Sequence, residues 1–147
     1  MGGLPMKKRL VHLILPVITL ILEIIPYGAV LNFKRPTDTG EIVDSITLYS
    51  YFDTMAFAWG NIAPMITGIF TCISLLFVIA YCVKGKNRTA IVARKLLLVT
   101  AVINLCPLFY GVKYLSLVAI LVTASLVTEA VLLTREIKND SISKLNL

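Results

Sequence analysis

Two glutamates stand inside long apolar stretches of this sequence, and they are its first candidates for chemistry. Glu23 lies in LILEIIPYG, three residues before Pro26, and Glu129 lies in LVTEAVLLT. A charged side chain at the centre of a bilayer costs at least about 2.5 kcal/mol on insertion scales. A carboxylate in such a stretch is therefore a candidate for binding or moving a proton or a cation.

Three further polar residues fall in or beside the apolar stretches. Asn104 has Pro107 one turn later, and we expect its amide to hydrogen-bond to a neighbouring helix. Asn61 opens an Asn-x-x-Pro segment, and we add it to the candidate functional residues. His12 follows the basic residues of the N-terminus by one turn, which is typical of an interfacial residue rather than of a proton relay.

The residue types do not favour an enzyme. The sequence has one histidine and no nucleophile-and-base set, phosphate-binding loop or cluster with metal-ligand spacing. The cysteines Cys72, Cys82 and Cys106 are spaced neither as metal ligands nor as a disulfide framework, so packing is their expected role. We expect no catalytic residues, no metal and no cofactor.

The composition is that of an integral membrane protein. The 147 residues are 58% hydrophobic and 15% charged, with a mean hydropathy of +0.88. A helix needs about 20 apolar residues to cross about 30 Å of hydrocarbon, and four stretches approach that length. We predict a single all-α membrane domain, a bundle of four transmembrane helices over residues of about 8–27, 62–83, 90–111 and 115–135.

The connection after the first helix has the composition of a β-hairpin. Its flanks are rich in Val, Ile, Thr, Tyr and Phe, whereas the middle, Pro36 to Gly40, concentrates turn residues. We predict a two-stranded extracellular hairpin over about 28–50, packed on helix ends or on a partner because an isolated hairpin is marginal in water. After it, Tyr51 and Trp59 suit the interfacial aromatic belt, and Pro64 suits a first helical turn.

The basic residues predict the orientation. All but three of the 14 Lys and Arg residues fall in the N-terminus, the loop between the second and third helices, and the C-terminal tail. Both termini should therefore be cytoplasmic, in the plasma membrane of a bacterium, with the positive loop against anionic headgroups rather than nucleic acid. We expect the first segment to be retained, because cleavage after Ala29 would put the bulky Tyr27 at a small-residue site.

The position of Glu23 depends on where the first helix ends. If the helix runs to Leu31, Glu23 lies deep in the membrane; if it ends near Pro26, Glu23 is about 5 Å from the outer end. Proline disfavours helical geometry in the residue before it, so we favour the shorter helix and a Glu23 near the surface, at the base of the hairpin. Glu129 lies near the cytoplasmic end, so the two glutamates should not pair. Its expected partners are Thr128, Ser125 or Lys95.

Three likenesses to known proteins bear on the fold. The segments Pro26–Leu31, Tyr49–Phe52 and Asn61–Pro64 loosely resemble those of small, uncharacterised bacterial four-helix membrane proteins, which implies a membrane fold and no activity. An outer hairpin between the first two of four helices resembles the claudin layout, without the loop cysteines of that family. Four helices with a first-helix carboxylate are similar to the small multidrug resistance transporters, which would imply that Glu23 exchanges protons and cations.

These observations favour a non-enzymatic protein of accessory, structural or partner-binding type, with the hairpin as its recognition surface. Its partners would be the lipid bilayer and another membrane protein or a second copy of itself. The alternative is a small transporter or channel subunit that uses Glu23 or Glu129.

Overall fold

The protein forms a helical bundle that carries a β-hairpin at one end. The computed structural model describes residues 9–54 and 61–145, and only the backbone of 143–145. Within these ranges the elements are η1 (Leu10–Leu13), α2 (Ile14–Ile24), β1 (Ala29–Pro36), β2 (Ile42–Tyr49), α4 (Ala63–Lys84), α5 (Asn87–Asn104), η2 (Cys106–Tyr110), η3 (Val112–Tyr114) and α6 (Leu117–Leu145). The predicted four-helix arrangement with a small antiparallel hairpin is confirmed. Trp59 lies outside the described residues.

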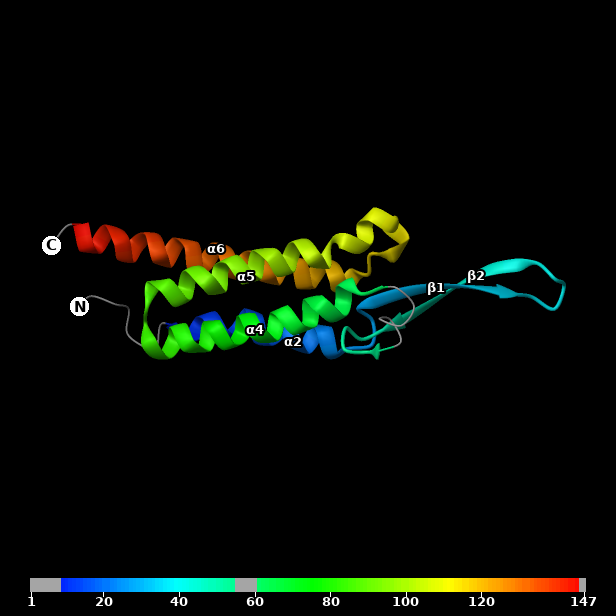
Figure 1. Cartoon of the computed structure of the whole chain (residues 1–147), viewed down its shortest axis with the longest axis horizontal. Helices are drawn as coiled ribbons and strands as arrows, with labels where there is room; N and C mark the ends of the chain where they lie inside the picture. The colour runs from blue at the N-terminus through cyan, green and yellow to red at the C-terminus, as the bar shows by residue number, and fades with distance from the viewer. Residues whose placement is uncertain (1–8, 55–60, 146–147) are drawn as a thin grey trace.

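The helices lie side by side, and the hairpin extends beyond them (Figure 1). α5 packs against both α4 and α6, and α2 packs against α6 and α4. The start of η1, the α4–α5 turn and the end of α6 lie at one end of the bundle, and the hairpin lies at the other. We call these the basic end and the hairpin end. The described basic residues towards the basic end are Arg9, Lys84, Lys86, Arg88, Arg94, Lys95, Arg135 and Lys138.

In the part of the chain that the structure describes, three segments are long and apolar enough to cross a membrane: Ala63–Lys84, Asn87–Tyr110 and Leu117–Ile142. The first helical segment is shorter than the predicted helix over residues 8–27. It consists of four residues of 3-10 helix followed by eleven of α-helix. It ends at Ile24, and Ile25 is extended (φ −65°, ψ 136°), as expected for a residue that precedes a proline. The shorter of the two predicted helices is therefore the correct one.

The last two helices differ from their predicted limits. α5 ends at Asn104 instead of continuing to residue 111, because Pro107 lacks the N–H that the helix would need, and the chain continues as 3-10 turns. α6 begins at Leu117, where the Ser116 hydroxyl accepts a hydrogen bond from the Ala119 N–H (2.9 Å), and it runs ten residues past the predicted end. α4 matches its prediction and has Pro64 in its first turn.

The hairpin is regular and its turn needs a glycine. β1 pairs with β2 from Ala29 opposite Tyr49 to Pro36 opposite Ile42. In the turn, the Gly40 N–H donates to the Thr37 carbonyl (2.8 Å) with φ at +80°, a conformation that L side chains rarely adopt. The first residues of β1 are buried and the last are exposed, so the hairpin is enclosed by protein mainly at its base.

The two ends of the molecule should label from opposite sides of a membrane. In a background with Cys72, Cys82 and Cys106 replaced by alanine, we expect Thr39→Cys in the hairpin turn to react with an impermeant maleimide on intact cells. Lys86→Cys, in the α4–α5 turn, should react only after the membrane is permeabilised, because the positive-inside rule places that turn in the cytoplasm. Labelling of both positions in intact cells would contradict this topology.

Candidate functional site

Glu23 is buried at the junction between the first helix and the hairpin. It lies one residue before the end of α2, as the shorter helix requires, but its exposed fraction is 0%. Its Oε1 accepts a hydrogen bond from the Thr71 hydroxyl (2.7 Å), and Oε2 has no hydrogen-bond partner within the described residues. Its carbonyl accepts from the Tyr51 N–H (2.9 Å). Glu23 thus lies at the end of the helix and at the base of the hairpin, as expected, but its side chain is enclosed by protein rather than open to solvent.

Buried hydroxyl groups lie on the same two helices as Glu23. Thr19, Thr67, Thr71 and Ser74 all have an exposed fraction of 0%. Thr19 and Thr67 donate to carbonyls four residues earlier in their own helices, so those hydroxyls are satisfied locally. The Ser74 hydroxyl has no partner among the described residues. The hydrogen bond from Thr71 to Glu23 is thus a polar link between two helices that are apolar overall.

Asn104 joins three elements by side-chain hydrogen bonds. Its Oδ1 accepts from the Tyr51 hydroxyl (2.6 Å), and its Nδ2 donates to the Ala119 carbonyl and to the Thr123 hydroxyl (2.8 Å each). The predicted bond from Asn104 to a neighbouring helix is confirmed. We expected Tyr51 in the interfacial belt, but its side chain is almost completely buried in the protein. A Cβ on Gly28 would clash with the Tyr51 ring, so only glycine fits at position 28.

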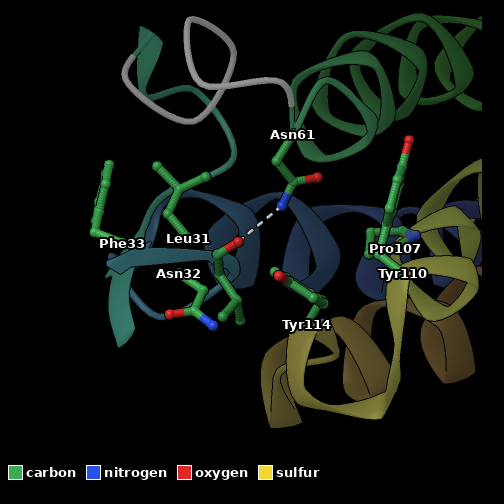
Figure 2. A pocket seen from close by; sticks show the side chains of 8 residues that line it. Leu31, Asn32, Phe33, Asn61, Pro107, Tyr110 and Tyr114 are labelled. Atoms are coloured by element: carbon green, nitrogen blue, oxygen red, sulfur yellow. Dashed lines mark hydrogen bonds between the residues drawn. The ribbon is translucent and has the colours of Figure 1, made fainter. Parts of the chain in front are cut away.

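Asn61 borders a pocket at the base of the hairpin (Figure 2). Its Nδ2 donates to the Val30 carbonyl (3.0 Å), which ties the chain just before α4 to β1. The pocket has a volume of about 330 Å³ and lies between β1 and the turn that joins α5 to α6. It is lined by Val30, Leu31, Asn32, Phe33, Asn61, Pro107, Tyr110 and Tyr114. A pocket of this size with aromatic walls and a few amides suits a small apolar group.

Glu129 is held by His12 rather than by its predicted partners. The His12 Nδ1 lies 2.7 Å from Glu129 Oε1, and its Nε2 contacts Glu136. Ser125 and Thr128 instead donate to carbonyls of their own helix. His12, expected at the interface, is 8% exposed. Glu23 and Glu129 do not pair, as predicted.

The outer part of the hairpin is exposed and mixes charge with apolar side chains. Ile42 and Ile46 on β2 are 71% and 57% exposed. Between them Asp44 lies 3.4 Å from the Lys113 Nζ in η3. A hydrogen bond from Asn32, and then the charge of Lys113, lower the pKa of Asp44, so it stays ionised to lower pH than a free aspartate.

Comparisons with known proteins do not identify the chain. No family model matches it, and no curated protein or solved structure shows significant similarity. Within residues 9–54 and 61–145, no group of three His, Cys, Asp or Glu side chains is placed to hold a metal ion. Function must therefore be argued from the sites above.

The bond between Tyr51 and Asn104 should stabilise the hairpin end. Tyr51→Phe leaves the buried Asn104 Oδ1 without its donor, and we expect a loss of about 1–3 kcal/mol in the free energy of unfolding. Tyr27→Phe is the matched control, because Tyr27 is exposed. Thermal unfolding of the purified protein in detergent measures both, and equal melting temperatures for the two variants would contradict the assignment.

Proposed function

We propose that the protein is a non-enzymatic, multi-pass membrane protein that binds another membrane protein through its outer hairpin. The observation that carries the proposal is the exposure of Ile42 and Ile46 on a strand that projects past the helices (Figure 1). Alternate residues of a strand share a face, so Ile42, Asp44, Ile46 and Leu48 form one surface, which we call the β2 face.

The β2 face has the properties of an unfilled interface. A two-stranded sheet with exposed apolar side chains is marginal in water, and its unpaired edges can accept a further strand. Ile46 and Leu48 also line a shallow groove of about 500 Å³ with Tyr27 and Leu117, where the hairpin meets the start of α6. An extended apolar segment of a partner lying in this groove would cover both the strand and the helix end.

The location of this surface supports the same proposal. The hairpin lies at the end away from most basic residues, and so outside the cell if the positive-inside rule holds. The aromatic turn Cys106–Tyr110 lies beside the hairpin, with Phe109 strongly exposed. We propose the plasma membrane of a bacterium, with both termini in the cytoplasm.

A photo-crosslinking amino acid at Ile46 should capture the partner in native membranes. We expect a covalent protein adduct of higher mass from this position and none from Val102, which is at least as exposed but lies on α5, where lipid is expected. Ile42→Lys should abolish the Ile46 adduct by placing a charge on the β2 face. Mass spectrometry identifies the adduct. If the adduct contains a second copy of the chain, the partner is the protein itself. If only lipid adducts form, the proposal is refuted.

A second candidate function is transport, with Glu23 or Glu129 as the working carboxylate. Glu23 favours it specifically, since it is fully buried and has one oxygen without a hydrogen-bond partner in the described residues. A buried carboxyl group in that state is able to take up a proton.

Under transport, Glu23→Gln should abolish proton flux in reconstituted vesicles while the protein still folds, because an amide of the same shape cannot exchange a proton. Glu41→Gln, in the exposed hairpin turn, is the control and should leave the flux unchanged. A pH-sensitive dye inside the vesicles gives the rate. Glu23 is excluded from this role if vesicles with the wild-type protein pass protons no faster than empty vesicles, or if Glu23→Gln leaves the rate of proton flux unchanged.

A further inference from the structure

A charged cluster is buried near the basic end, on the opposite half of the bundle from Glu23. His12 in η1 lies between two carboxylates of α6, with its Nδ1 2.7 Å from Glu129 Oε1 and its Nε2 in contact with Glu136. Glu129 and Glu136 are seven residues apart, which places them on one face of the helix. All three side chains are at most 10% exposed, so water does little to screen these contacts.

The contacts of the two ring nitrogens indicate the protonation state of His12. A neutral imidazole has one N–H and one lone pair, whereas an imidazolium donates from both nitrogens. Here the Nδ1 lies within hydrogen-bond distance of a Glu129 oxygen, and the Nε2 contacts a Glu136 oxygen that accepts no hydrogen bond of regular geometry from the described residues. With both carboxylates ionised, a neutral ring would direct a lone pair at one of them, a repulsive arrangement in a buried site.

We propose that His12 is a proton-binding site, whose bound proton fastens the first helix onto α6. The ligand is a single proton, held on an imidazolium that bridges Glu129 and Glu136. This site is separate from the hairpin and needs no partner protein.

The other groups around His12 are consistent with a positive ring. From its own segment, Arg9 donates to the Tyr81 carbonyl (3.4 Å), and its positive charge opposes a second one nearby. From α4, the Tyr81 ring stands edge-on to the imidazole with centroids 6.1 Å apart, and the Cys82 thiol donates to the Arg9 carbonyl (3.0 Å). From α6 come the two glutamates, and Asp140 lies one turn beyond Glu136. Two carboxylates in direct contact outweigh one guanidinium that is bonded elsewhere.

The proton matters to the fold because the first helix is short, and the His12 cluster is one of its polar contacts with α6. Loss of the proton would leave two buried carboxylates facing a neutral ring, which favours separation of η1 from α6. The first helix leads into β1 after four residues, so such a movement would reach the base of the hairpin. The importance of such a movement at the hairpin rests on the proposed function, whereas the proton site itself does not.

The single histidine of the chain permits a direct test. The full chain, labelled with ¹⁵N-histidine and freed of any affinity tag, is placed in lipid nanodiscs and its imidazole nitrogens are observed by NMR. At about pH 8, where an exposed histidine is almost entirely neutral, we expect both nitrogens to carry a proton. Glu129→Gln and Glu136→Gln should each shift the titration to lower pH, and Glu41→Gln should not. A neutral ring at that pH in the wild type overturns the proposal.

A second measurement tests the fastening. A histidine whose charged form is favoured by its partners in the folded state stabilises the protein at low pH, and this stability is lost as the pH rises through its titration. The melting temperature of the wild type should therefore fall as the pH rises through the range found by NMR. His12→Gln should melt lower and lose this dependence, since glutamine does not titrate. A wild-type melting temperature that does not change over that range would show that the proton does not fasten the helix.

Discussion

The constraint on which the rest depends is the shortness of the first helix. Pro26 ends it at Ile24, before it can span the bilayer in the way that the other three helices can. Apolar contact over so few turns is limited, and polar groups at its two ends supply the remaining attachment. Near the basic end His12 contacts α6, and at the other end Glu23 bonds to α4 and to the backbone of Tyr51. His12 and Glu23 thus attach this segment to the rest of the bundle.

The same attachment determines how the hairpin is presented. Gly28 passes against the Tyr51 ring, Asn61 bonds to Val30, and Ser116 donates to the Gly28 carbonyl (2.7 Å), so the base of the hairpin is held by three parts of the chain. Beyond this base only the Lys113–Asp44 contact reaches the strands among the described ion pairs. A base held in this way favours binding, because the strands that carry the β2 face are positioned before a partner arrives.

The two glutamates that first suggest transport have different surroundings. The His12 ring contacts the Glu129 carboxylate and can compensate its negative charge. The Glu23 carboxylate instead accepts a hydrogen bond from a neutral hydroxyl, that of Thr71. The two carboxylates lie towards opposite ends of the bundle and share no hydrogen-bond partner among the described residues. They therefore form two separate sites.

The sequence by itself determined the elements, and only the tertiary structure decided what the polar residues contact. Hydropathy, proline and glycine positions predict the bundle, the end of the first helix and the hairpin, because these depend on neighbours within a few residues. The partner of Glu129 is 117 residues away in the chain, and Glu136 lay just beyond the predicted helix end, so no local pattern reveals the cluster. The burial of Glu23 likewise follows from where Tyr51 returns to the bundle. Long-range packing sets such contacts, and a single sequence without that packing leaves several partners equally acceptable.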